Sequence, residues 1–132
     1  MISVSADTAV YSTETLTLTA GKWRVFFWGQ LELGWVSASG ARVAGAFLRN
    51  QSDSTIIARQ IAKASLASSN DDLVLPVQLE EIVNISTSKT FDVGVICSHA
   101  NTVVTARIYG NGTVYSGSNV VGHAKMIATR IG

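Results

Sequence analysis

The sequence predicts an all-β fold, a jelly-roll-like antiparallel sandwich of about eight strands. Apolar and polar residues alternate with a period of two, most cleanly in Thr15–Thr19 (TLTLT), as expected for a half-buried strand. Clusters of Ser, Asn, Asp and Gly separate such stretches at regular intervals. The 132 residues show no fixed repeat and no long linker, so we expect residues 1–132 to form a single β-sandwich domain.

The expected strands cover most of the chain. Ala20-Gly21 ends the first clear alternation, and Phe91, Val93, Val95 and Cys97 share one face of a later strand. In order, the expected strands are 2–5, 14–19, 22–33, 42–50, 54–62, 73–85, 89–99, 102–109 and 120–131. The expected turns are Ser37–Gly40, Gln51–Ser54, Ser65–Asp72, Ser86–Ser88 and Gly110–Asn119.

Two positions limit this assignment. Pro76 has no N–H to donate to a ladder, so we expect it near a strand start or on a sheet edge. The segment Ile56–Leu66 could also form a helix, because Ile57, Ile61 and Ala64 lie at helical spacing. Ile57, Arg59 and Ile61 alternate equally well with their neighbours, and we therefore predict a strand here.

The composition indicates association with other subunits. Hydrophobic residues make up 47% of the chain and charged residues only 14%, whereas a typical soluble domain has about 25% charged residues. Neutral Ser and Thr replace the missing charge. The longest apolar runs, such as Val25–Trp28, are far too short to cross a bilayer. The basic residues are scattered rather than clustered, so we expect neither a nucleic-acid nor a membrane partner.

No catalytic, metal or cofactor site is predicted. His99 and Cys97 lie two residues apart, but no third ligand is near them in sequence, and His123 is the one other histidine. Neither a nucleophile elbow nor a phosphate-binding loop is present. Adjacent strand residues point to opposite faces, so Glu80 and Glu81 cannot share a site. Cys97, the only cysteine, forms no intrachain disulfide, and the N-terminus does not resemble a signal peptide.

The expected strand 22–33 is apolar on both faces. Trp23, Val25 and Phe27 occupy one face, whereas Phe26 and Trp28 occupy the other. A strand of a monomeric sandwich normally has one face in water. We therefore expect another subunit, rather than a loop of the same chain, to cover Phe26 and Trp28. The candidate interface residues are Phe26, Trp28, Trp35, Tyr109 and Tyr115.

The pattern Leu16-x-Leu18-x-Ala20-Gly21-x-Trp23-x-Val25 resembles the early strand pair of C1q/TNF-like jelly-roll domains. The strand Thr90–Ile96 and the ending Met126–Ile131 look like the small versions found in bacteriophage virion proteins. The Phe-x-Gly near the C-terminus of animal C1q domains is missing, so no C1q-type ligand is implied. The resemblance implies a jelly roll that assembles mostly as trimers and serves as a capsid decoration, head fibre or tail-fibre tip.

We therefore expect a structural virion protein on the capsid exterior, assembled in the host cytoplasm. Its expected role is capsid decoration or cementing, in which the protein associates with itself and bridges subunits of the major capsid protein. A homotrimer is expected, with a dimer as the alternative. The chain begins nearly at its first expected strand and shows no stalk, which favours decoration over a fibre tip.

Three other functions remain open. A tail-fibre or head-fibre tip would bind a host receptor or glycan through exposed loop aromatics such as Trp35 or Tyr115. A small-molecule barrel would need a cavity in place of a filled core. A cupin-like enzyme would need a metal, for which the two histidines show no suitable spacing.

Overall fold

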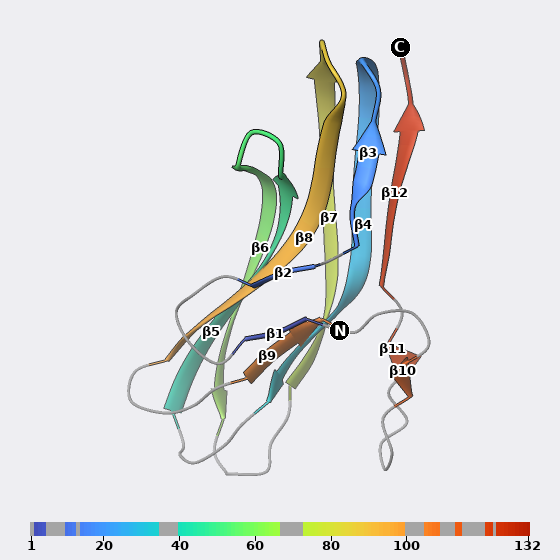
Figure 1. Cartoon of the computed structure of the whole chain (residues 1–132). Helices are drawn as coiled ribbons and strands as arrows, with labels where there is room; N and C mark the ends of the chain where they lie inside the picture. The colour runs from blue at the N-terminus through green and yellow to red at the C-terminus, as the bar shows by residue number, and fades with distance from the viewer. Residues whose placement is uncertain are drawn as a thin grey trace.

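The computed structural model describes residues 2–4, 10–12, 14–34, 40–66, 73–99, 105–108, 113–114, 121–122 and 124–132. Every regular element in these ranges is a β-strand (Figure 1), which confirms the predicted all-β class. The strands are β1 Ile2–Val4, β2 Val10–Tyr11, β3 Leu16–Leu18, β4 Gly21–Gly34, β5 Gly40–Asn50, β6 Thr55–Leu66, β7 Leu73–Ile85, β8 Lys89–His99, β9 Thr105–Ile108, β10 Thr113–Val114, β11 Val121–Gly122 and β12 Lys125–Arg130.

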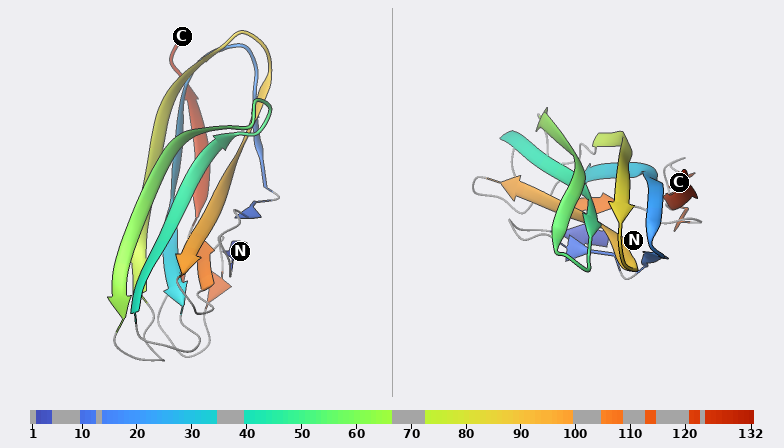
Figure 2. Two further views of the ribbon diagram at one scale, coloured as in Figure 1. Left: turned by 90° about the vertical axis from the view of Figure 1, so that its left-hand side faces the viewer. Right: turned by 90° about the horizontal axis from the view of Figure 1, so that it is seen from above.

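The strands form two five-stranded antiparallel sheets that pack face to face. In sheet A, β4 pairs with β7 on one side and with β9 and β12 on the other, and β1 pairs with β9. In sheet B the order is β2-β8-β5-β6, and β3 also pairs with β8. The short strands β10 and β11 form a separate hairpin. The predicted antiparallel sandwich is therefore confirmed (Figure 2).

The chain passes repeatedly from one sheet to the other. β3 lies in sheet B, β4 in sheet A, β5 and β6 in sheet B, β7 in sheet A, β8 in sheet B and β9 in sheet A. Only β5 and β6 are consecutive long strands within one sheet. This alternation places each apolar face opposite the other sheet and produces the jelly-roll-like arrangement. The long strands run along one axis, and the β7–β8 turn and the C-terminus lie at the same end of the molecule (Figure 1, Figure 2).

The core lies between the two inner faces. On β4, Val25, Phe27 and Leu31 point inward and are at most 4% exposed. The inward row of β8 is Phe91, Val93 and Val95, as its alternation predicts. Trp23 packs against the end of this core and is partly buried. The full set of buried core residues is Leu18, Val25, Phe27, Leu31, Ala44, Ala46, Leu48, Val77, Leu79, Ile85, Phe91, Val93 and Val95.

The long strand β4 begins where the sequence pattern breaks. Gly21 has φ of 145°, a backbone conformation that glycine adopts without the steric cost of a Cβ atom. From Gly21 to Leu33, β4 is paired without interruption with β7, so that Gly21 lies opposite Ile85 and Leu33 opposite Leu73. The ladder fixes which residues of β4 face the core and which face outward.

β7 is an edge strand, and its edge is bonded by side chains. Gln60 of β6 donates from Nε2 to the carbonyl of Pro76 (3.0 Å) and accepts from the N–H of Gln78 (3.2 Å). The side chain of Glu81 accepts the N–H of Ile82 (3.0 Å). Pro76 therefore lies on a sheet edge as predicted, where its missing N–H removes no bond to β4.

The segment predicted either as strand or as helix is a strand, β6, which extends beyond the expected end at residue 62. Its register against β5 shifts between Leu48 and Arg49, so that Leu48 pairs with Ala58 and Arg49 with Ile56. Ile57 is the extra residue of this β-bulge. Beyond the bulge, Ala58 and Ala62 contact the core. The alternation of Ile57, Arg59 and Ile61, from which the strand was predicted, did not reveal this bulge.

Other strand limits also differ from the expected ones. The short strands β2 and β10 were not predicted, because two residues carry no detectable period. The expected strand 120–131 consists of β11 and β12. The expected strand 14–19 is shorter, Leu16–Leu18. The expected strand 102–109 is described only over Thr105–Ile108.

Candidate functional site

The outer face of sheet A carries an apolar patch. Because inward residues of β4 have odd numbers, Phe26 and Trp28 point outward, as the sequence predicts. Phe26 is half-buried and Trp28 is 37% exposed. Two further isoleucines lie on the same face, Ile82 of β7 (52% exposed) and Ile127 of β12 (40% exposed). We call Phe26, Trp28, Ile82 and Ile127 the sheet A patch.

The strand register places Phe26 beside Trp28 and Ile127, whereas Ile82 lies opposite Arg24. Phe26 lies opposite Ile127 on one side and Glu80 on the other. Trp28 occupies the next outward position of β4, between Lys125 and Gln78. These outward neighbours on adjacent strands are close enough for their side chains to interact. The patch therefore extends over three adjacent strands, β7, β4 and β12.

An ion pair lies within the sheet A patch. Arg24 donates from Nε to Glu80 Oε1 (2.6 Å) and from Nη2 to Oε2 (3.0 Å), a bidentate arrangement. Both side chains are about half exposed to solvent. The hydrogen bond from Arg24 holds the pKa of the Glu80 carboxyl below its usual value. Because Glu81 bonds a backbone N–H instead, the two adjacent glutamates have separate partners, as their alternation predicts.

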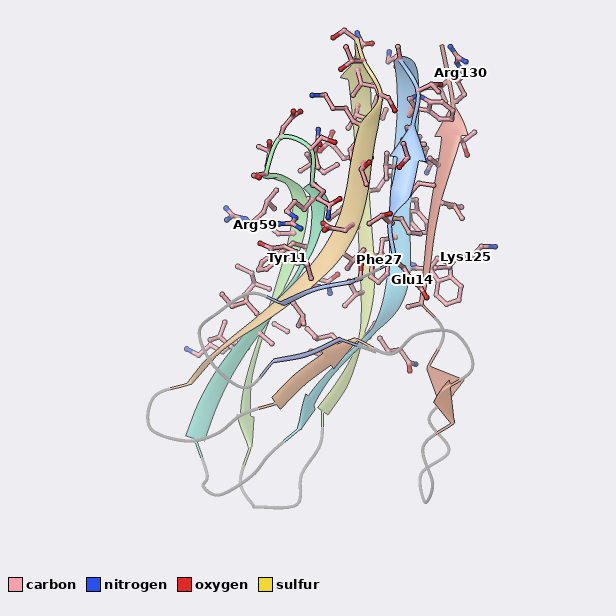
Figure 3. All side chains as sticks on the ribbon, viewed as in Figure 1. Tyr11, Glu14, Phe27, Arg59, Lys125 and Arg130 are labelled. Carbon is pink, nitrogen blue, oxygen red and sulfur yellow. The ribbon has the colours of Figure 1, made fainter. Side chains whose placement is uncertain are left out.

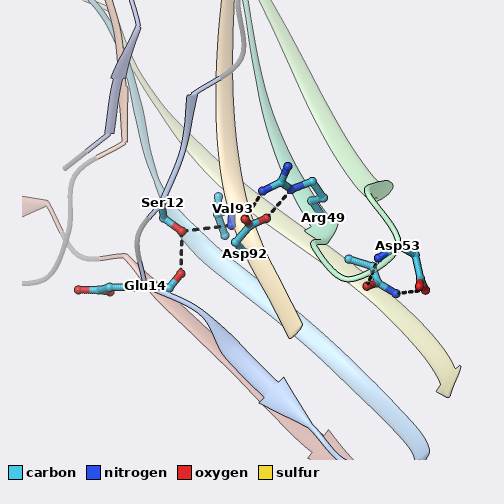
Figure 4. A network of polar contacts seen from close by, with 7 residues as sticks. Ser12, Glu14, Arg49, Asp53, Asp92 and Val93 are labelled. Atoms are coloured by element: carbon cyan, nitrogen blue, oxygen red, sulfur yellow. Dashed lines mark hydrogen bonds and ion pairs between the residues drawn. The ribbon is translucent and has the colours of Figure 1, made fainter. Parts of the chain in front are cut away.

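The outer face of sheet B has a different character. Asp92 of β8 is fully buried and is bound by Arg49 of β5 through two hydrogen bonds, one of them 2.8 Å long (Figure 4). The Arg49 guanidinium lies 3.4 Å from the ring centroid of Tyr11 in β2. Ser12 then donates to the carbonyl of Glu14 and accepts the N–H of Val93 (Figure 4). These contacts fasten the N-terminal part of the chain to sheet B.

The β5–β6 hairpin is closed by polar contacts of its own. Asn50 Nδ2 donates to Asp53 Oδ2 (2.8 Å), and the Asn50 Oδ1 accepts the N–H of Asp53 (3.2 Å) (Figure 4). Lys89 Nζ forms an ion pair with Asp53 Oδ1. These residues stabilise the predicted turn Gln51–Ser54 and tie it to the start of β8. The Asp53 carboxylate therefore has two side-chain partners, the Asn50 amide and the Lys89 ammonium group.

The residues weighed as metal ligands are placed only by the backbone of sheet B. Cys97 lies opposite Ala44 in the β5–β8 ladder, and His99 lies opposite Arg42. His123 lies outside the described residues. Among the described residues, no group of three or more His, Cys, Asp or Glu side chains is arranged to hold a metal ion. Nor does that part of the chain contain a helix long and apolar enough to span a membrane.

Three of the five candidate interface residues, Trp35, Tyr109 and Tyr115, lie outside the described residues. The other two, Phe26 and Trp28, lie together in the sheet A patch. Ile82 and Ile127 were missed as candidates. The alternation of Leu75, Val77 and Leu79 on the inner face of β7 already implies that even positions such as 82 point outward.

Comparisons of the chain with known protein families, with curated proteins and with solved structures find no match. The arguments for its function therefore rest on its own sequence and geometry.

Proposed function

We propose that the protein is a structural virion protein that decorates or cements the capsid exterior. In this role, copies of the chain associate through the sheet A patch, with a homotrimer as the expected assembly. The assembly bridges subunits of the major capsid protein and adds buried contact area between them. The observation that carries this proposal is the group of large apolar side chains on the outer face of sheet A.

The sheet A patch has the composition of an interface. Large aromatic residues are enriched among the side chains that contribute most to protein–protein binding, and the patch contains both Phe26 and Trp28. Contiguous apolar surface on a soluble protein is a common mark of an interaction site. The polar pair Arg24–Glu80 already has its hydrogen bonds made. When another subunit covers this pair, these two hydrogen bonds remain and offset part of the cost of removing the two charges from water.

The low charge of the whole chain also supports association with other subunits. Only 14% of residues are charged, whereas exposed surfaces of monomeric domains are usually rich in charge. The jelly-roll resemblance contributes the virion context and the expected trimer. A fibre tip that binds a receptor or glycan is the alternative within that same context.

Measurement of the mass in solution tests self-association. The wild-type protein is expected to form a stable oligomer at micromolar concentration. Trp28→Ala is expected to weaken association by at least about 2 kcal/mol, the usual threshold for an interface hot spot. Ile61→Ala removes an exposed apolar side chain from the other sheet and serves as the matched control, with no change in mass expected. A monomeric wild type would refute the proposal.

The virion role is tested separately by the genomic position of the coding sequence. A neighbouring gene for a major capsid protein would support decoration. A neighbouring tail-fibre gene would favour the fibre-tip alternative, and glycan-array binding by the purified protein would then be the direct assay.

A further inference from the structure

The edge strand of sheet B presents a row of exposed residues on the side of the molecule opposite to the sheet A patch. Ala58, Gln60 and Ala62 of β6 pair with the inward residues of β5, so Arg59, Ile61 and Lys63 point outward. All three are exposed, and Ile61 is 61% exposed. We call these three residues the β6 row.

The β6 row carries two positive charges that have no acidic partner among the described residues. Neither Arg59 nor Lys63 forms an ion pair with any described residue, and Arg59 extends away from the sheet (Figure 3). The described carboxylate on the outer face of this sheet, Asp92, is buried and already bound by Arg49. An acidic group of another molecule could therefore approach the β6 row without displacing an internal pair.

We propose that the β6 row binds an extended segment of a different protein. In this segment, an apolar residue lies two positions after one acidic residue and two positions before another. Residues in a strand rise about 3.4 Å each, so Arg59 and Lys63 lie about 14 Å apart with Ile61 midway between them. An extended segment has the same repeat. Its two carboxylates then meet the two cations while its central apolar side chain covers Ile61.

The chain itself cannot supply this segment. None of its 9 acidic residues is followed four positions later by another acidic residue, so no part of the chain has the required pattern. The partner is therefore a different protein rather than a second copy. This inference does not depend on the proposed function, because it uses another face of the molecule and other residues.

The residues of the β6 row also favour a protein over a nucleic acid. Single-stranded nucleic acids bind to grooves in which several cations follow the backbone and exposed aromatic rings stack on bases. On this face, the described aromatic residues are Phe47, which is buried, and Tyr11, which is stacked on Arg49. An exposed isoleucine between two cations contributes nothing to phosphate binding but much to an apolar contact.

A synthetic peptide provides the test. The probe is a short fluorescent peptide in which every second residue is Thr and the residues between are Glu and Val in turn. Its binding is followed by fluorescence anisotropy. Wild-type protein is expected to bind it. The double variant Arg59→Glu/Lys63→Glu is expected to bind at least about tenfold more weakly because two attractive charge pairs become repulsive. Ile61→Ser is expected to weaken binding about tenfold through the lost apolar contact.

The matched control reverses two charges on the opposite face. Lys22→Glu/Lys125→Glu changes the net charge equally but is expected to leave the affinity within about twofold, since distant exposed charges are screened. An equal loss in the control, no binding by wild type, or equally tight binding of an oligonucleotide of the same charge would each overturn the proposal. Thermal melts establish that every variant is folded. The mass of Trp28→Ala reports on the proposed function alone, so the two proposals fail independently.

Discussion

Tyr11 lies directly over Gly94, where the chain has no side chain. A Cβ atom on Gly94 would be only 2.6 Å from Cδ1 of Tyr11 and 2.7 Å from Cε1. The pairing of β2 with β8 brings these two residues opposite each other. The Tyr11 ring can therefore lie across β8 at Gly94, where it also stacks on Arg49.

Gly94→Ala is expected to destabilise the protein by about 1–3 kcal/mol, the usual cost of inserting an extra methyl group into a well-packed site. Urea denaturation measures the change. Gly45→Ala is the matched control, because its new Cβ would meet only side-chain atoms at 3.3 Å or more, and a smaller loss is expected. In a Tyr11→Ala background the Gly94→Ala cost should largely disappear. If the cost is unchanged there, Tyr11 is not the residue that excludes a side chain at position 94.

Asp92→Ala is expected to cost about 3–5 kcal/mol, because it leaves the partly buried Arg49 without its partner. Replacing both residues together, as Arg49→Met/Asp92→Leu, should cost less than Asp92→Ala alone, since no unpaired charge remains. Chemical denaturation of Arg49→Met, Asp92→Leu and the double variant gives the coupling energy. Additive effects would show that the ion pair contributes nothing beyond the packing of each residue.

The Arg24–Glu80 pair is expected to make a small contribution to stability that depends on pH. The hydrogen bond from Arg24 lowers the pKa of Glu80 below its ordinary value of 4.5. A carboxyl with a lowered pKa in the folded state stabilises the fold above its unfolded pKa, and this contribution is lost as the pH falls through the folded pKa. The stability difference between wild type and Glu80→Gln should therefore be present at pH 6 and be lost progressively as the pH falls below 4.5 and through the lowered pKa of Glu80.

The contribution of the pair is also expected to shrink with added salt, because both side chains are exposed. Thermal melts of the two proteins across this pH range, at low and high salt, measure both effects. A difference that grows on acidification would contradict the assigned direction of the pKa change.

Phe27→Ala and Phe26→Ala compare the two faces of one strand. Phe27 is 4% exposed in the core, and its truncation is expected to cost about 3–5 kcal/mol through the cavity that it leaves. Phe26 is only half-buried, and its truncation should cost the monomer less but weaken self-association. Denaturation and solution mass, measured on the same samples, separate the two effects. Equal loss of fold stability in both variants, with assembly unchanged, would place Phe26 in the core.

Much of the fold could be predicted because the long strands alternate apolar and polar residues, and this alternation shows which residues face the core. The expected strand 73–85 coincides with β7, and the two faces of β4 were correctly separated from Trp23 to Trp28. The bulge at Leu48/Arg49 and the strand β2 could not be predicted. β2 depends on a contact between distant parts of the chain, Tyr11 with Gly94, and the bulge is a change of register that the periodicity of one strand does not reveal.

The sheet A patch could be predicted only in part for the same reason. Phe26 and Trp28 stand out locally because they interrupt an expected polar face. Ile127 becomes part of the patch only because β12 pairs with β4 in a register that brings Ile127 opposite Phe26. The ion pair of Arg24 with Glu80 likewise joins residues that are far apart in sequence.

The side-chain amide of Gln60 and the carboxylate of Glu81 occupy backbone groups at the edge of β7. A foreign strand would have to displace both before it could extend sheet A there, so open-ended growth by strand addition is disfavoured. In the proposed assembly, copies would instead meet through the sheet A patch, whose side chains would set the angle between neighbours. A fixed angle that closes on itself yields a ring with a set number of members, and such an assembly can match the symmetry of a larger shell.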